Sequence, residues 1–189
     1  MNFLLNPQFR RIFCLMVRQN FSKECEDALN KQINMELKAC HAYLAMAYHF
    51  DRSDVATTGL FNFFKQASLE ERHHAELIME YMNKRGGQII LSSVPEPKAS
   101  YVSAKEALIE ALNMEKEVNE SLLDVHATGA KVNDPNLCDF IETHFLQEQV
   151  DGLKILADFI RQLERAECDL GVYLFDKYLL NAHMHNKAK

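Results

Sequence analysis

Glycine and proline are scarce in this chain, with six and four among its 189 residues, and runs of β-branched residues are nearly absent. Glycine and proline are the residues that most often interrupt a helix, and β-branched runs are typical of strands. The sequence therefore has several long stretches suited to helix and none suited to a sheet. We expect an all-α protein.

Long apolar runs and basic clusters are also missing. No apolar segment approaches the roughly 20 residues that a membrane helix needs. The net charge is −6, and the chain has no basic patch with interleaved aromatic residues of the kind that binds nucleic acids. Charged residues make up 25% and hydrophobic residues 48%, a balance found in soluble globular domains. We expect one globular domain, with no membrane span and no nucleic-acid partner.

The cysteines do not form a disulfide framework or a zinc site. Cys14, Cys25, Cys40, Cys138 and Cys168 are odd in number, scattered, and include no C-x-x-C pair. Free thiols in a reducing compartment are the simplest interpretation. Secretion is not expected, and an intracellular location is predicted.

The first 20 residues differ in composition from the rest. They contain Arg10, Arg11 and Arg18, no acidic residue, and interspersed apolar residues. This pattern is weakly similar to a mitochondrial presequence, although a mildly basic N-terminal arm fits equally well. The predicted location is cytoplasmic or mitochondrial, and the predicted domain spans 21–182, with a tail at 183–189.

Helical periodicity predicts long helices at 23–50, 58–85, 104–132 and 136–167, and a shorter one at 170–182. Ser22 and the Asp134–Pro135 pair are typical helix starts, and Gly86–Gly87 is a typical helix end. Residues 51–57 and 133–135 are short enough only to reverse the chain. Residues 86–103 are long enough to run the length of a bundle, so the second and third helices should be parallel. The sequence predicts a four-helix bundle with one long crossover and a short fifth helix.

Each of the four long helices places metal-binding side chains midway along an otherwise apolar face. These side chains are Glu36, Glu71 with His74, Glu115 and Gln149. No lysine or arginine falls on these faces, and burying three carboxylates without a cation is very costly. A single such glutamate is more often bent toward solvent or paired. Four that share one level of a bundle favour a metal site.

The segment 70–74 offers two E-x-x-H pairs, and the apolar face distinguishes them. Glu71 and His74 continue the apolar face, whereas Glu70 and His73 lie on a more polar one, so Glu70 is at most a ligand at the edge. Carboxylates with one imidazole suit iron or manganese.

The two halves of the predicted site are unequal. Glu36, Glu71 and His74 hold one ion, while the second has Glu71, Glu115 and a weak Gln149 oxygen. A poorly held ion favours iron as substrate.

Several stretches of the chain resemble ferritin subunits of the heavy, ferroxidase-active type. They are VRQNF, QINMELKA, HFDRSDVA, EERHHAE, NKRGG, NDPNLCDFIETHFLQEQV and YLFDKY, and the likeness extends from Val17 to Lys177. The resemblance implies that the ferroxidase residues are Glu36, Tyr43, Glu70, Glu71, His74, Glu115 and Gln149. It further implies two Fe(II) ions per subunit as substrate, oxidation by dioxygen, and mineral storage in a hollow shell of twenty-four subunits. The shell could be a homo-oligomer or contain other ferritin subunits.

The resemblance also implies channels through the shell. Asp139 and Glu142 match its acidic three-fold entry channel, with His126 and Cys138 nearby, and the fifth helix would line a four-fold channel. Acidic residues in the first turns of a helix are also common without such a role. The connection RAECDLG is shorter than the family's and lacks the expected Gly/Pro turn, and His183 and His185 could bind metal or belong to a surface tail.

Other functions remain open. A di-iron oxygenase or a manganese peroxidase-like enzyme has the same bundle, but a second E-x-x-H is missing. A structural shell subunit is the third possibility, against which the intact ligands count. Tyr43 could hydrogen-bond a ligand or supply an electron, or it could be an ordinary core tyrosine.

Overall fold

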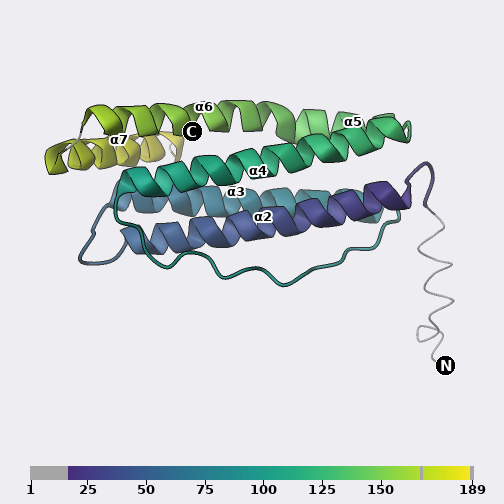
Figure 1. Cartoon of the computed structure of the whole chain (residues 1–189), viewed down its shortest axis with the longest axis horizontal. Helices are drawn as coiled ribbons and strands as arrows, with labels where there is room; N and C mark the ends of the chain where they lie inside the picture. Colours follow the sequence, from purple (N-terminus) through teal and green to yellow (C-terminus); the bar gives the residue numbers. More distant parts are fainter. Residues whose placement is uncertain (1–16, 167, 188–189) are drawn as a thin grey trace, which may run out of the picture.

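The computed structural model describes residues 17–166 and 168–187, with side chains to residue 181. Four long helical segments lie side by side and a fifth follows at one end (Figure 1). Their bounds are α2 Lys23–Phe50, α3 Thr58–Lys84, α4 Ala104–Lys131, α5 Pro135–Ile141, η2 Glu142–Leu146, α6 Gln147–Arg165 and α7 Asp169–Lys187. The described ranges contain no strand, and the predicted all-α fold is confirmed. None of these helices is both long and apolar enough to cross a membrane.

The connection from α3 to α4 runs along the whole bundle, so these two helices are parallel (Figure 1). Two asparagines of α2 hold it in place. Asn30 Oδ1 accepts from the backbone N–H of Ile90 at 2.7 Å, and Asn34 Oδ1 accepts from that of Ser92 at 2.7 Å. These bonds satisfy backbone donors that would otherwise lack partners in a segment without secondary structure. The predicted crossover is confirmed.

The helix starts follow the predicted capping chemistry. Ser22 accepts from Cys25 N at 3.1 Å, and Asp134 accepts from Leu137 N at 3.1 Å with Pro135 in the first turn. These side chains satisfy backbone N–H groups that have no partner within the helix. At the end of α3, Gly86 has φ 74°, a conformation that glycine adopts without strain.

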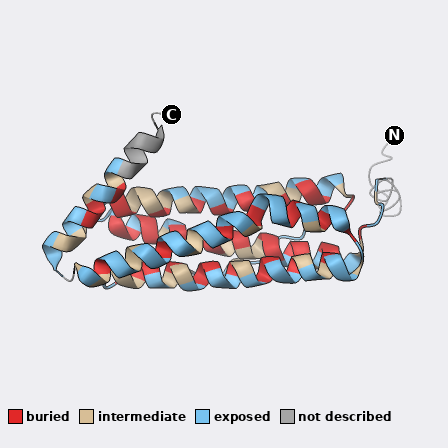
Figure 2. Cartoon of the chain, turned by 90° about the horizontal axis from the view of Figure 1, so that it is seen from above, coloured by how far each residue is buried: buried red, intermediate tan, exposed pale blue. Residues whose placement is uncertain are grey.

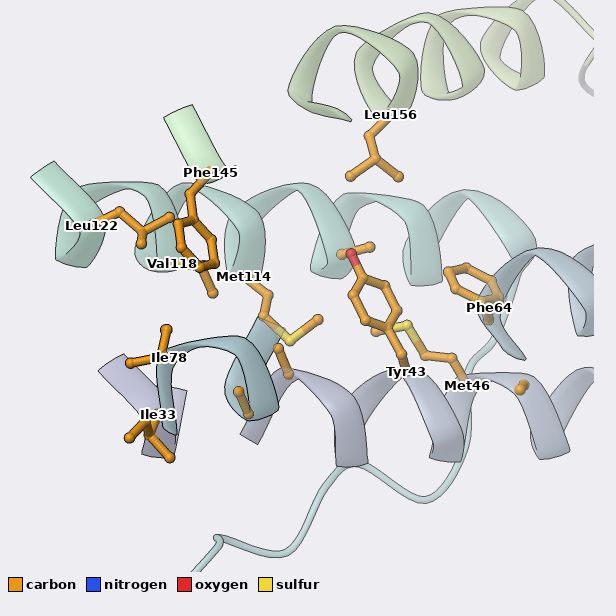
Figure 3. Packing of buried hydrophobic residues seen from close by; sticks show 14 of the residues in the cluster. Ile33, Tyr43, Met46, Phe64, Ile78, Met114, Val118, Leu122, Phe145 and Leu156 are labelled. Atoms are coloured by element: carbon orange, nitrogen blue, oxygen red, sulfur yellow. The ribbon is translucent and has the colours of Figure 1, made fainter. Parts of the chain in front are cut away.

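The apolar faces predicted from the sequence meet in the centre of the bundle (Figure 2). Tyr43, Phe64, Ile78 and Leu122 are buried there, and Figure 3 shows how residues from neighbouring helices interdigitate. Burial of such side chains contributes about 1.5–3 kcal/mol each and provides most of the driving force for folding. Cys25, Cys40, Cys138 and Cys168 are free thiols, as predicted.

The fourth segment differs from the single helix predicted over 136–167. It contains a π-helical turn, η2, and ends at Arg165. Ile141, Phe145 and Gln149 are spaced four apart and are all buried. In a regular α-helix each four-residue step overshoots one turn by about 40°. The wider π-turn absorbs part of this rotation and keeps Gln149 directed toward the core.

Helix α7 is longer than the predicted 170–182 because residues 181–187 contain no glycine or proline to end it. It leaves the end of the bundle obliquely (Figure 2) and packs against the start of α3. Asp176 Oδ1 accepts from Leu60 N at 2.9 Å. His183 and His185 lie in this helix, but their side chains are outside the described part. So are residues 1–16, which hold most of the predicted N-terminal segment.

Candidate metal centre

Three of the predicted ligands form a cluster between α2 and α3. Glu36, Glu71 and His74 each place a ligand atom within 4.8 Å of the other two. Their exposed fractions are 0%, 4% and 8%. Glu71 and His74 are one turn apart on α3, and the packing of α2 against α3 brings Glu36 to face them.

Neighbouring polar groups orient this cluster. Gln32 Nε2 donates to Glu36 Oε1 at 2.7 Å. His74 Nδ1 lies 3.5 Å from Glu71 Oε2, while its Nε2 lies 3.3 Å from Glu148 Oε2. An imidazole that binds a metal through one nitrogen usually contacts a carboxylate or carbonyl through the other. Nδ1 is therefore directed toward the cluster, and Glu148 orients the ring by its contact with Nε2.

The cluster fits a cation on two grounds. Glu36 Oε2 and Glu71 Oε2 are buried, and neither has a hydrogen-bond partner among the described residues. Burial, together with the nearby Glu71, raises the pKa of Glu36 well above its usual value. Burial and the charge of Glu115 raise the pKa of Glu71 to about 8. A bound cation would compensate these carboxylates and supply the missing partner.

Glu115 on α4 forms a second group beside the cluster. Tyr43 donates its hydroxyl proton to a hydrogen bond with Glu115 Oε1, and Gln149 Nε2 donates to Oε2 at 3.0 Å. Burial, followed by the charge of Glu115, raises the pKa of Tyr43 well above its usual value, so its hydroxyl stays a donor. Gln149 Oε1 is buried and has no partner in the described part of the chain. It therefore remains available, beside the Glu115 carboxylate, to bind an ion.

A cavity of about 680 Å³ connects the two groups to the surface. Glu71, His74, Glu115 and Gln149 line its inner part, and Leu179 of α7 lines another side. Glu70 is at the exposed side, where its carboxylate accepts from Gln66 at 3.1 Å. The structure thus places Glu70 at the edge of the site, apart from the buried cluster.

Sequence reasoning did not single out Gln32. It is fully buried, and its Oε1 has no partner among the described residues. Its position one turn before Glu36 could have identified it, because residues four apart on a helix face each other.

The residues predicted for an entry channel lie at the far end of α4. His126 Nε2 is 2.6 Å from Glu142 Oε1, and Cys138 Sγ is 3.7 Å from the carbonyl oxygen of His126. Burial raises the pKa of the Cys138 thiol, so it stays protonated at neutral pH. Asp139 is exposed. The three side chains His126, Cys138 and Glu142 are therefore neighbours, while the channel itself stays a prediction.

A bundle with one long crossover and a buried carboxylate–histidine cluster defines the class of ferritin-like metalloproteins. Residues 26–166 match the family model described as "Ferritin-like domain". The chain belongs to this family.

Named relatives cover nearly the same region. The chain is 48% identical to the soma ferritin of Lymnaea stagnalis over 166 residues, covering 87% of this chain and 95% of the relative. It is 48% identical to the ferritin-2 heavy chain of Schistosoma mansoni over 165 residues, covering 87% and 96%. The middle ferritin subunit of Salmo salar is 44% identical over 168 residues, covering 87% and 96%.

Proposed function

We propose that this chain is the ferroxidase-active subunit of an iron-storage ferritin. It binds Fe(II) between its long helices, oxidises it with dioxygen, and passes ferric iron to a ferric oxyhydroxide mineral inside a hollow shell. The observation that carries this proposal is the buried cluster of Glu36, Glu71 and His74, which has two carboxylate oxygens without partners among the described residues. Relatives that are named as ferritin heavy chains support the same function.

Two Fe(II) ions bind per subunit as substrate. Glu36, Glu71 and His74 hold the first, and Glu71, Glu115 and Gln149 Oε1 hold the second. Iron binding displaces protons from Glu36 and Glu71, because the pKa of each is raised in the metal-free protein. The second ion gains only a neutral amide beside its carboxylates, so it is held less tightly and can leave.

The other side chains position these ligands. Tyr43 fixes Glu115 through its hydroxyl, Gln32 fixes Glu36, and Glu148 fixes the ring of His74. Dioxygen enters through the cavity, and ferric product leaves past Glu70 at its exposed side.

The shell of twenty-four subunits is also part of this proposal. Large apolar side chains remain exposed on the outside of α2 and α3 and along α7. They include Leu44, Leu69, Leu170, Tyr173, Leu174 and Tyr178. Burial of such side chains at subunit interfaces would remove them from water. The shell is a homo-oligomer or a mixture with other ferritin subunits, and its compartment is the cytoplasm or the mitochondrion.

A di-iron oxygenase or manganese peroxidase-like enzyme is the alternative of the same fold. Such symmetric sites draw an E-x-x-H pair from a second helix. Here α6 provides Glu148 and Gln149, followed by Val150 and Asp151, without a histidine at that spacing. The structure offers no observation that favours this alternative.

The experiment that tests the proposal measures particle size and iron content together. Fe(II) is added aerobically to the purified metal-free protein, and the particle is sized before and after. We expect a large hollow particle that retains far more than two irons per chain. A small particle that saturates at two irons per chain would favour the oxygenase alternative.

A further inference from the structure

Four aromatic rings lead from the candidate metal centre to the crossover segment. Tyr43 stacks with Phe64 at 6.1 Å between ring centroids, Phe64 with Phe50 at 5.5 Å, and Phe50 with Tyr101 at 6.5 Å. Their interplanar angles are 27°, 14° and 19°, so the rings are nearly parallel. Figure 3 shows the first pair, with Tyr43 beside Phe64. These spacings are those of favourable aromatic pairs, and the rings form a continuous packed row.

Both ends of the row are phenols, and each donates to a carboxylate of α4. Tyr43 donates to Glu115, and Tyr101 donates to Glu110 Oε1 at 3.3 Å. The two middle residues are phenylalanines, which are far harder to oxidise than tyrosine. A phenol can lose an electron without becoming a cation only if its proton has an acceptor. This row has such an acceptor at each end and at neither middle position.

We propose that Tyr101 is the outer end of an electron-transfer relay that removes an oxidising equivalent from Tyr43. The inference rests on the proposed ferroxidase function. When only one Fe(II) is bound, reduction of dioxygen to hydrogen peroxide lacks one electron. Tyr43 supplies it and its phenol proton moves to Glu115, while the two protons that complete hydrogen peroxide come from water.

The relay then restores Tyr43. One electron passes from Tyr101 through Phe50 and Phe64 to the Tyr43 radical, which regains its proton from Glu115. The proton of Tyr101 moves to Glu110. The net change is one neutral tyrosyl radical moved from Tyr43 to Tyr101, with each electron matched by a proton. The stacked rings shorten the gaps that the electron must cross, and tunnelling rates fall steeply with distance.

The surroundings of Tyr101 are suited to a long-lived tyrosyl radical. Tyr101 is 6% exposed, and Lys98 Nζ lies 4.9 Å from its ring centroid. Lys98 Nζ also lies 3.4 Å from Glu110 Oε2, so the ring, the lysine and the carboxylate form one local cluster. The radical is thereby held on a connecting segment, away from the metal ligands. A thiol or another small one-electron reductant in solution can return it to a phenol.

Tyr48 provides a matched control. It is 52% exposed on α2, and its ring contacts Phe61 at 5.7 Å, outside the row that starts at Tyr43. A radical produced by oxidants diffusing in solution should form on Tyr48 more readily than on Tyr101. A radical conducted through the protein should form on Tyr101 instead.

The test is freeze-quench electron paramagnetic resonance on the full-length assembled protein, mixed aerobically with one Fe(II) per subunit. The variants are Tyr101→Phe, Phe50→Leu, Tyr43→Phe and Tyr48→Phe. We expect a long-lived tyrosyl signal in the unmodified protein that is absent from the first three variants and unchanged in Tyr48→Phe. In Tyr101→Phe, which keeps the ring in place, a shorter-lived signal from Tyr43 should replace it.

Iron oxidation is followed by absorbance in the same samples. If the unmodified protein does not oxidise Fe(II), the proposed function itself fails. If it oxidises Fe(II) but Tyr101→Phe keeps the same signal and decay, or Tyr48→Phe removes the signal, the relay alone is overturned. Phe50→Leu is judged only if its particle size matches that of the unmodified protein, and Tyr101→Phe decides the matter otherwise.

Discussion

Gln149 donates a hydrogen bond to Glu115, with its Nε2 3.0 Å from Oε2 of that carboxylate. The amide thereby directs its remaining oxygen, which is buried and without a partner among the described residues, toward the space where the second ion would bind. A neutral side chain at this position both stabilises the metal-free site and limits how tightly the second ion is held.

We expect Gln149→Glu to reverse both effects. In the metal-free protein two buried carboxylates would face each other, which should lower stability by about 1–3 kcal/mol. With iron bound, the added charge should hold the second ion more tightly. The first oxidation should proceed while repeated turnover slows, as measured by oxygen consumption over successive Fe(II) additions. Equal rates at every addition would show that Gln149 does not set iron release.

Replacing Glu71 and His74 together with alanine should abolish fast Fe(II) oxidation without dissociating the shell. Both side chains face the buried cluster, and Glu71 is proposed to contact both ions. The metal-free protein should keep or gain stability, because two buried polar side chains that are costly to desolvate are removed. Stopped-flow absorbance measures the oxidation, and chemical denaturation measures the stability.

The control for this variant is His73→Ala with Glu76→Ala. These residues have the same chemistry on the exposed side of α3. Fast oxidation should survive in the control. Oxidation at the unmodified rate in Glu71→Ala with His74→Ala would place the catalytic centre elsewhere.

The bundle and its buried cluster could be predicted because they depend on periodicity and capping. Ser22, Asp134 and Pro135 start their helices as expected, and Glu36, Glu71 and His74 meet because each lies midway along an apolar face. Such features need only the local sequence and the rule that apolar faces pack together. The family identified from the sequence is confirmed by the matched family model.

The remaining features depend on contacts between distant residues. The π-turn at Glu142–Leu146 arises where one helix must keep four-spaced residues facing a core that other helices define. The docking of α7 depends on Gly59, more than a hundred residues away from Asp176. Neither the π-turn nor the docking of α7 produces a hydrophobic periodicity in its own segment of the sequence. The hydrogen bond from Gln32 to Glu36 is local, but glutamines without such a role occur at the same spacing.

The stability of the metal-free protein should decrease as the pH rises from about 5 to about 8. Burial raises the pKa of Glu71 to about 8, from 4.5 in an unfolded chain. Between these values the unfolded state releases the proton first, so rising pH favours unfolding, and Glu36 shifts in the same direction. Denaturation of the metal-free protein at several pH values measures the slope. In Glu71→Gln the decrease should be smaller, and an identical slope in both proteins would exclude Glu71 as its source.

Asp139→Asn with Glu142→Gln should slow iron uptake several-fold and weaken its dependence on ionic strength. If these carboxylates repeat around a three-fold axis, they form a ring that concentrates cations. Glu142 also pairs with His126, so His126→Ala is the control that removes this contact while keeping both acidic residues. Uptake is measured over a salt series. Unchanged uptake would leave Asp139 and Glu142 as ordinary acids near a helix start.

Gly59→Ala should detach α7 from the bundle while leaving the candidate metal centre intact. A Cβ atom at position 59 would lie 2.0 Å from the carbonyl oxygen of Asp176, a backbone atom that cannot move aside by a side-chain rotation. The hydrogen bond from Leu60 N to Asp176 would be lost with this contact. Hydrogen exchange should therefore increase along α7, and shell assembly should weaken. Gly152→Ala on α6 is the control, because its added Cβ meets nothing within 4 Å, and it should stabilise the helix by about 0.5–1 kcal/mol. If α7 in Gly59→Ala exchanges as slowly as in the control, the packing of Gly59 against Asp176 does not hold the helix in place.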